Sequence, residues 1–319
     1  MTTLFSLDPA RRAAASPREG SLAAARALLV VNGVLFAGVY AFAKVAGVGG
    51  VSPLGVLTWQ VLFAAIVVWL VAAARGELPA LARANVRYAA LAGLLGITGP
   101  NLVSFAALAH LPAGLVGLIT ALSPVFTYAI AVALRAEALH PWRAAGIALG
   151  FAGVLTLVLS RGWLPGSPPL LWTLAALLAP VFLAGGNVFR TLAWPEGLKP
   201  LAAATLLLAL QSALLIPLSV VLNQFEAPGA GLQAQDGALF GAGVLTALFY
   251  LGAFQLQRLG GPVVVGQLGY VITLASLAIG ALAFGERYGP STLIAVVVVL
   301  AGLMLVNRRQ QTAEGANLD

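Results

Sequence analysis

Residues 285–309 read GERYGPSTLIAVVVVLAGLMLVNRR, in which a carboxylate and a proline precede an apolar run that ends at two arginines. The stretch from Ala295 to Val306 contains no polar side chain, so it lacks the alternation over about ten residues that is typical of a β-barrel strand. A transmembrane helix needs about 20 mostly apolar residues. The segment therefore predicts a helix that crosses a lipid bilayer.

The composition of the whole chain agrees with this interpretation. Of 319 residues, 61% are hydrophobic and only 8% are charged, whereas soluble domains have about 25% charged residues. A soluble enzyme, a nucleic-acid-binding domain and a disordered chain are therefore excluded. The chain has no cysteine, which excludes disulfides, thiolate metal sites and cysteine nucleophiles. We expect no cofactor and no metal site.

Cutting the chain at charges, prolines and glycine clusters leaves ten runs long enough to span a bilayer. They cover residues 27–48, 53–74, 88–110, 112–134, 141–160, 169–190, 200–222, 237–257, 260–284 and 289–307. The predicted fold class is an all-α polytopic membrane protein with ten transmembrane helices.

The basic residues predict the orientation of these helices, because Lys and Arg concentrate on the cytoplasmic side of membrane proteins. With ten spans, 14 of the 17 basic residues fall on the side that holds both termini. The other side receives Lys44, Arg161 and Arg287. Both termini are therefore predicted to be cytoplasmic, and the basic excess marks a membrane face rather than a nucleic-acid-binding surface.

The second half of the chain repeats the first at an offset of 149 residues. Seven residues fall on identical residues in the second half: Val116, Gly117, Ile130, Glu137, Pro141, Ala152 and Gly153 on Val265, Gly266, Ile279, Glu286, Pro290, Ala301 and Gly302. Each copy has five spans, and because five is odd the second copy crosses the membrane in the opposite sense. Such halves can exchange conformations and open a central site to either side in turn, which favours a carrier.

This repeat divides the chain into four parts: a cytoplasmic segment 1–26, a first five-helix repeat 27–160, a second, inverted repeat 161–307 and a cytoplasmic tail 308–319. The resemblance of the repeats to a known family is carried by Ala136-Glu137 with Gly146, Gly150 and Gly153, and by Gly285-Glu286 with Gly302. These residues resemble the EamA-type branch of the drug/metabolite transporter superfamily, and within it the YddG-type exporters of aromatic amino acids. The resemblance implies a bacterial inner-membrane protein whose spans 1, 3, 4, 6, 8 and 9 surround a central cavity.

Ionisable residues inside a bilayer are expensive and are usually functional. By this division every Asp and Glu falls in a tail or a loop, so we expect facilitated or weakly coupled transport. Lys44 lies in the outer part of the first span, where its ammonium either reaches the interface or attracts a substrate carboxylate. Glu137 and Glu286 stand where each could cap the helix that follows it. The Gly146-x-x-x-Gly150 motif favours close helix packing, and we expect a monomer rather than a dimer.

Prolines and polar side chains inside the cavity spans are the remaining candidates. Pro100, Pro124 and Pro180 are predicted to kink or break spans three, four and six, which exposes backbone groups to a substrate. Amide side chains could replace the water that a polar substrate sheds, and tyrosines could offer aromatic faces. The predicted substrate-binding residues are Tyr40, Lys44, Asn101, Tyr128, Asn187, Tyr250, Gln267 and Tyr270.

The predicted function is export of small metabolites, above all aromatic and other hydrophobic amino acids, by alternating access around a central cavity. The partners are a small-molecule substrate and membrane lipid. A multidrug or other-metabolite exporter of the same fold is the alternative. An intramembrane enzyme is not expected, because no paired aspartates, zinc ligands or Ser-His set lie within the predicted spans. A membrane scaffold would retain a packed, apolar interior, which the mid-span prolines and polar side chains argue against.

Overall fold

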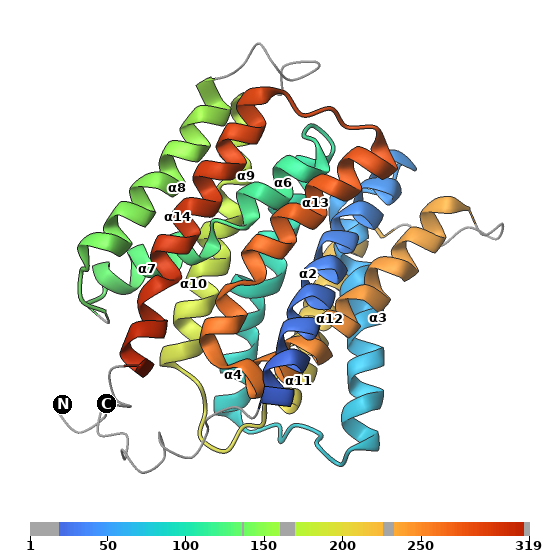
Figure 1. The fold of residues 1–319 in the computed structure, drawn as a ribbon. Coiled ribbons are helices and arrows are strands. Elements are labelled where there is room, and N and C mark those ends of the chain that lie inside the picture. The colour runs from blue at the N-terminus through green and yellow to red at the C-terminus, as the bar shows by residue number, and fades with distance from the viewer. Residues whose placement is uncertain (1–18, 136, 160–169, 226–232, 316–319) are drawn as a thin grey trace.

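The structure is a computed structural model that describes residues 19–135, 137–159, 170–225 and 233–315. This part of the chain forms a bundle of helices without a β-strand (Figure 1). The elements are α2 (Glu19–Val48), α3 (Pro53–Ala74), α4 (Arg83–Gly93), the π-helical turn η1 (Leu94–Thr98), α5 (Gly99–Leu108), α6 (Ala113–Thr120), α7 (Ser123–Ala133), α8 (Pro141–Leu159), α9 (Leu170–Ala176), α10 (Leu178–Leu192), α11 (Pro200–Val221), α12 (Ala234–Gly266), α13 (Leu268–Phe284) and α14 (Pro290–Gly315).

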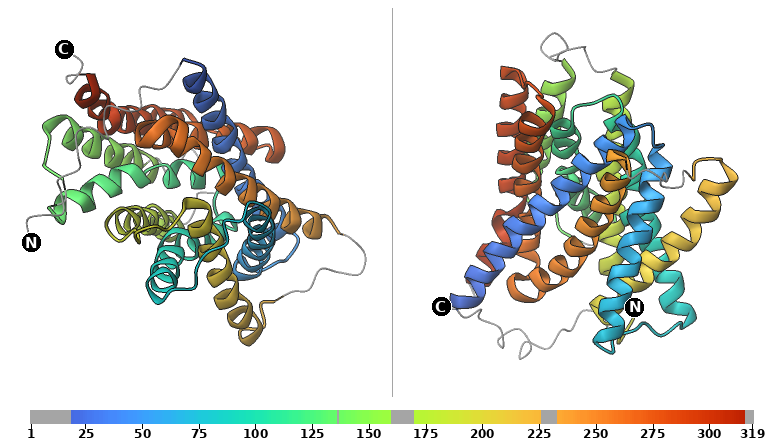
Figure 2. Two further views of the ribbon diagram at one scale, coloured as in Figure 1. Left: turned by 90° about the horizontal axis from the view of Figure 1, so that it is seen from below. Right: turned by 90° about the vertical axis from the view of Figure 1, so that its right-hand side faces the viewer.

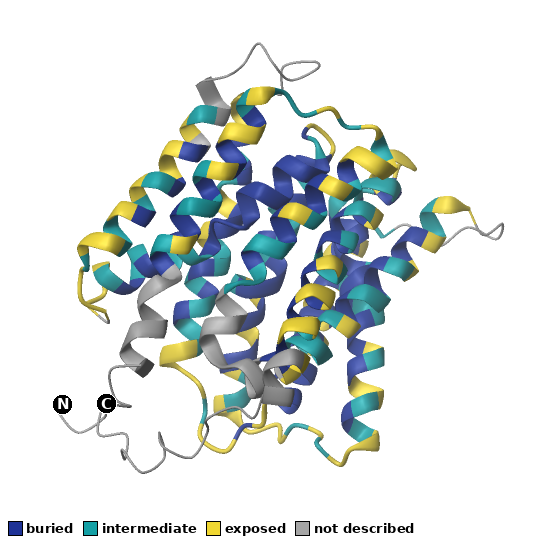
Figure 3. Cartoon of the chain, in the orientation of Figure 1, coloured by how far each residue is buried: buried dark blue, intermediate teal, exposed yellow. Residues whose placement is uncertain are grey.

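Within the described residues, seven helical segments are long and apolar enough to cross a membrane. They are Ala24–Val48, Pro53–Ala74, Arg83–Leu108, Ala113–Ala133, Leu170–Leu192, Pro200–Val221 and Ala234–Ala253, and Leu268–Phe284 and Pro290–Val306 are shorter apolar helices. Their outward faces carry exposed apolar side chains, such as Leu282 at 89% and Val297 at 66% exposure. Surfaces of this kind are suited to lipid rather than water (Figure 3).

The helix ends differ from the sequence-based limits in three places. Helix α2, which contains the first predicted span, begins at Glu19 rather than at residue 27, and α14 continues to Gly315 rather than ending at residue 307. The loop expected between residues 257 and 260 is part of α12, and the chain breaks instead at Gln267. Charged residues and glycines end an apolar run, but they do not end a helix at the edge of a membrane, where water satisfies the polar side chains.

Within the described residues, four of the predicted spans are interrupted, and in three of them the interruption lies beside one of the predicted prolines. Pro100 follows the π-helical turn and lies in the first turn of α5. Pro124 is the second residue of α7, after a break at residues 121–122, and Pro180 lies in the first turn of α10 after a break at Leu177. Proline is tolerated in a first turn, because the N–H groups there have no partner within the helix.

The contacts between helices are similar in the two halves. Helix α2 packs along α12, and α10 packs in the same way against α4, η1 and α5. Helices α8 and α14, the last of each repeat, lie side by side (Figure 1). Their backbones meet at glycines, because a Cβ on Gly302 would lie 2.8 Å from the carbonyl oxygen of Gly146 and from the nitrogen of Gly150. The small-residue motif of α8 is thus used within the chain.

The described ends of the chain lie at the same end of the bundle. Helix α2 starts and α14 finishes there, in the lower part of Figure 1, and the two further views of Figure 2 agree. We call the opposite end, where α2 ends and α3 begins, the Lys44 end. The basic residues predict that the Lys44 end faces outward, and that orientation stays a prediction.

Candidate functional site

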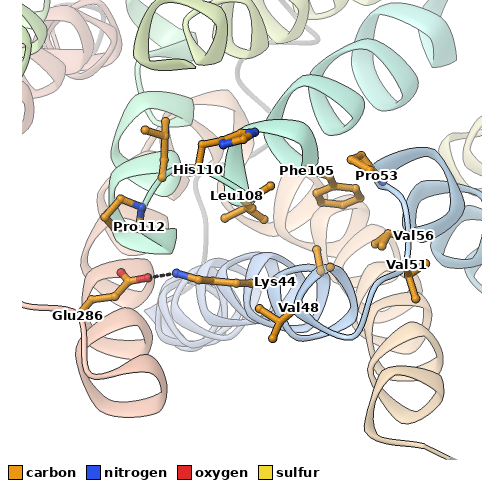
Figure 4. A pocket seen from close by; sticks show the side chains of 14 residues that line it. Lys44, Val48, Val51, Pro53, Val56, Phe105, Leu108, His110, Pro112 and Glu286 are labelled. Atoms are coloured by element: carbon orange, nitrogen blue, oxygen red, sulfur yellow. Dashed lines mark hydrogen bonds and ion pairs between the residues drawn. The ribbon is translucent and has the colours of Figure 1, made fainter. Parts of the chain in front are cut away.

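A pocket of about 500 Å³ opens at the Lys44 end of the bundle (Figure 4). Its walls come from the last turns of α2, the start of α3, the end of α5 and the loop that leads into α6. Glu286, from the loop between α13 and α14, closes one side. We call this cavity the Lys44 pocket, because it lies between the end of α2, which carries Lys44, and the loop before α14.

The wall of the Lys44 pocket carries an ion pair between residues of different repeats. The Nζ atom of Lys44 lies 2.5 Å from Oε1 of Glu286. Only 18% of the lysine side chain and 8% of the glutamate side chain are exposed, so water screens this pair less than it screens a surface ion pair. The ammonium also lies 4.9 Å from the ring centre of Phe284, a favourable cation–π distance.

Four donors hold the Glu286 carboxylate. Besides Lys44, the backbone N–H of Ala113 donates to Oε1 at 2.7 Å, and that of Gly114 donates to Oε2 at 3.2 Å. The Tyr288 hydroxyl donates to Oε2 at 2.6 Å. Glu286 therefore caps the N-terminus of α6 and not, as the sequence suggested, the helix that follows it. Glu286 does lie in a loop, as predicted, but its side chain folds inward and only 8% of it is exposed.

These contacts determine the ionisation states of Glu286 and Tyr288. Burial alone would raise the pKa of Glu286, but the hydrogen bonds from Lys44, Tyr288, Ala113 and Gly114 outweigh it, so the pKa lies below its ordinary value. Burial, the hydrogen bond to Glu286 and the negative charge of that carboxylate raise the pKa of the Tyr288 phenol. At neutral pH the glutamate is therefore ionised and the tyrosine is a neutral donor.

The rest of the pocket is mainly apolar. Val48, Val56, Phe105 and Leu108 line it from three helices. His110 stands at the wall, and its ring stacks on Trp172 with the centroids 4.1 Å apart. A ligand here would meet a charged side and an apolar side, which is the usual composition of a small-molecule site.

Tyr40 lies one helical turn before Lys44 on α2 and is buried next to the pocket residue Phe105. Its hydroxyl donates to Oγ1 of Thr120 at 2.9 Å and lies 3.4 Å from Oγ of Ser104. These bonds join α2, α5 and α6 beside the pocket. Tyr40 is 1% exposed, so in this conformation it supports the pocket without lining it.

A second polar cluster lies on α10, away from the Lys44 pocket. Asn187 donates to Oγ of Ser123 and Oγ1 of Thr127, both at 3.3 Å, and accepts from Nη2 of Arg190 at 2.5 Å. The guanidinium of Arg190 faces the Cα of Gly96 in the π-helical turn. Side chains on a helix lean toward its N-terminus, so Arg190 reaches into the bundle from the helix end. Sequence reasoning missed this contact, because it counted Arg190, the last residue of the predicted span 169–190, only as one of the basic residues that mark the cytoplasmic side.

The other predicted residues are spread along the bundle. Asn101 donates to the carbonyl of Ile97 at 2.9 Å, within the π-helical turn. The Tyr128 hydroxyl donates to the carbonyl of Ala138 and accepts from the N–H of His140, both at 2.9 Å, and so holds the loop before α8. Gln267 lies at the break before α13, and Tyr250 and Tyr270 are half-buried against the core. Of the predicted set, only Lys44 lines the Lys44 pocket.

One further buried amide was missed, although its position inside the first predicted span is the same signal that selected Asn101 and Asn187. Asn32 on α2 is fully buried, and both of its side-chain polar atoms lack a hydrogen-bond partner. It faces Gly252 of α12. Within the described residues, no cluster of three or more His, Asp or Glu side chains could hold a metal ion.

Comparison with known proteins identifies the family. The model of the EamA-like transporter family matches the chain twice, over residues 25–159 and 170–308. A search of curated proteins gives no match. A solved structure described as "Crystal structure of protein" is 21% identical, with a TM-score of 0.60, and the match covers 89% of this chain and 97% of that one. That likeness shows the fold.

The two family matches cover most of the sequence and agree with the two repeats. The apolar helices, the lipid-suited surface and the paired repeats are those of a polytopic membrane protein. The chain belongs to the EamA-like transporter family.

Proposed function

We propose that the protein exports small metabolites, above all aromatic and other hydrophobic amino acids. The observation that carries this proposal is the Lys44 pocket, which presents an ammonium, a carboxylate and an apolar wall within about 500 Å³. An amino acid has the same three parts: a carboxylate, an ammonium and an apolar side chain. A site of this size encloses most of a small ligand.

Alternating access between the two repeats is the proposed mechanism. Two halves of opposite sense can exchange conformations and expose the same central cavity on either side. The helix breaks at Pro100, Pro124 and Pro180 lie between rigid segments, where a change of backbone angle costs least. We assign both termini to the cytoplasm and the protein to a bacterial inner membrane, in keeping with the distribution of basic residues.

Transport is proposed to be facilitative or weakly coupled. A proton-coupled carrier needs a group that gains and loses a proton during the cycle. Glu286 is the buried carboxylate of the described bundle, and its hydrogen bonds keep its pKa below the ordinary value. A carboxylate held in this way stays ionised at neutral pH. Glu286 is therefore a poor proton carrier as long as these hydrogen bonds are intact.

A multidrug or other-metabolite exporter is the second candidate. The apolar wall formed by Val48, Val56, Phe105 and Leu108 would also accept lipophilic compounds. Such ligands need no ion pair, so the ion pair in the wall favours the amino-acid exporter.

Uptake into proteoliposomes separates the two candidates. The purified protein is reconstituted, and entry of radiolabelled phenylalanine, threonine and a quaternary-ammonium dye is measured with and without a proton gradient. Saturable phenylalanine uptake that ignores the gradient supports the facilitative exporter. Uptake of the dye alone supports the multidrug exporter, and no uptake of any of them contradicts both.

A further inference from the structure

The ion pair in the wall of the Lys44 pocket restricts the charge of any ligand that enters it. Lys44 and Glu286 are both largely shielded from water, with 18% and 8% of their side chains exposed. Removing the partner of a charge in such a place is strongly unfavourable, since the remaining charge has neither water nor a counter-ion. A ligand that disturbs the pair must therefore supply new partners for both charges.

The number of donors on Glu286 shows where a ligand could bind. Oε1 accepts from Lys44 and Ala113, and Oε2 accepts from Gly114 and Tyr288. An ionised carboxylate has about four acceptor sites, so all of them are filled. An incoming ammonium can reach the carboxylate only by replacing a donor. Lys44 is the replaceable one, because two of the others are backbone N–H groups and Tyr288 belongs to the same short loop.

We propose that the Lys44 pocket binds zwitterions by exchange of ion-pair partners. The ammonium of the ligand takes the place of Lys44 on Glu286, and the released Lys44 binds the carboxylate of the ligand. The apolar part of the ligand lies against Val48, Val56 and Phe105. This proposal rests on the proposed function, because it assumes that the substrates are amino acids. It adds a rule of charge, which is that a ligand needs both an ammonium and a carboxylate to bind.

The same exchange explains why compounds with one charge are rejected. A carboxylate alone would take Lys44 and leave Glu286 without a cation. An amine alone would take Glu286 and leave Lys44 beside a second ammonium. With a zwitterion, every charge is paired before and after binding. The selectivity of the pocket therefore comes from the unpaired charge that a ligand with only one charge would leave behind.

The exchange also acts on the contact that ties three parts of the chain together. Glu286 holds the N-terminus of α6 through two backbone N–H groups while Lys44 holds the same carboxylate from α2. Release of Lys44 frees α2 from the loop before α14 but leaves α6 capped. The ligand would therefore loosen α2 at the Lys44 end without breaking the cap on α6.

Calorimetry with the full-length protein in detergent tests the rule of charge. Phenylalanine is titrated beside 3-phenylpropionate and 2-phenylethylamine, which keep the ring and lose one charge each. We expect phenylalanine to bind at least about tenfold more tightly than either, because each charged hydrogen-bonded contact is worth about one such factor. Equal affinity for either single-charge compound overturns the proposal.

Variants test whether the ion pair is the site. Lys44→Met and Glu286→Gln are each expected to weaken phenylalanine binding about tenfold or more. Glu137→Gln is the matched control, because Glu137 is the repeat counterpart of Glu286 and pairs with Arg143 outside the pocket. It should bind phenylalanine as the wild type does. Unchanged affinity in both Lys44→Met and Glu286→Gln overturns the proposal.

Val48→Trp covers the case in which the charge variants fail to fold. Val48 lines the pocket and is 83% exposed, so the larger side chain is placed at the edge of the pocket, to obstruct it, and does not enter the core. Loss of phenylalanine binding in this variant supports the site, and wild-type affinity contradicts it. Uptake into proteoliposomes separates the site from the proposed function. Phenylalanine transport without charge-dependent binding refutes the site alone, and charge-dependent binding without transport refutes the exporter alone.

Discussion

Glu137 and Glu286 occupy equivalent positions in the two repeats, 149 residues apart, but their carboxylates have different surroundings. Glu286 is 8% exposed and joins α2 to the N-terminus of α6. Glu137 is 45% exposed and pairs with Arg143 of the helix that follows it. One end of the bundle is thus tied by its glutamate, whereas the equivalent glutamate at the other end bonds locally.

The stability that Glu286 contributes should depend on pH. Its pKa is lowered in the folded protein relative to the ordinary 4.5, so the contribution is fully present above that value and is lost as the pH falls through the lower, folded pKa. We expect Glu286→Gln to lower the free energy of unfolding at pH 7 by about 1–3 kcal/mol, and so to unfold at a lower temperature than the wild type. Thermal unfolding from pH 7 to pH 3 should show the two proteins converge at the acid end.

Glu137→Gln provides the comparison for that series. Because Glu137 is 45% exposed, its ion pair should contribute less than about 1 kcal/mol. A loss as large as that of Glu286→Gln, or a gap between Glu286→Gln and the wild type that persists unchanged to pH 3, would show that the ionised, buried Glu286 carboxylate is not the source of the extra stability.

The glycine contact between α8 and α14 predicts a sharp response to one methyl group. In Gly302→Ala, the new Cβ would lie 2.8 Å from backbone atoms of Gly146 and Gly150, so a helix must shift. We expect a loss of about 1–3 kcal/mol, visible as a lower melting temperature. Gly185→Ala is the control, since nothing lies within 4 Å of a Cβ there. It should be neutral or stabilising by up to about 1 kcal/mol, and equal losses in both would contradict the contact.

The π-helical turn in the third span should depend on Gln211 of α11. This buried side chain accepts from Oγ1 of Thr98 at 2.6 Å and donates to the carbonyl of Ala90 at 3.2 Å. Gln211→Leu leaves the Thr98 hydroxyl without that acceptor, so we expect a loss of about 1–3 kcal/mol. Denaturant unfolding measures it. Thr191→Val, at an exposed helix position, should change little, and a similar loss there would remove the support for a special role of Gln211.

The orientation can be tested cleanly, because the chain has no cysteine. Val48→Cys places a thiol at the Lys44 end, and Leu139→Cys places one at the other end; both sites are exposed, at 83% and 65%. In intact cells a membrane-impermeant maleimide should label the first and spare the second. The reverse pattern would show that the Lys44 end faces the cytoplasm.

Much of the fold could be predicted from the sequence, because lipid imposes a simple rule on length and polarity. The family match confirms the two repeats, and the apolar segments agree with most of the predicted spans. The helix ends were less predictable. Arg258 and the glycines after it end an apolar run, yet α12 continues through them to Gly266, since a helix at a membrane edge tolerates polar side chains.

The site was harder to predict for a different reason. The sequence singled out Lys44 as a basic residue within a span, but its partner lies 242 residues away, and no local pattern reports such a contact. Glu286 looked like a loop residue, since the chain around it is polar. That its side chain folds inward depends on the position of the α6 N-terminus, which only the assembled bundle provides.

The separation of Lys44 and Glu286 along the chain also affects how the protein is made. Synthesis runs from the N-terminus, so Lys44 enters the membrane long before Glu286 has been added. During that interval its ammonium has no carboxylate partner and must stay near the lipid headgroups. The N-terminus of α6 is uncapped for the same period. The pocket is therefore completed only when the last loop arrives, and a chain cut short before residue 286 would have neither the ion pair nor the cap.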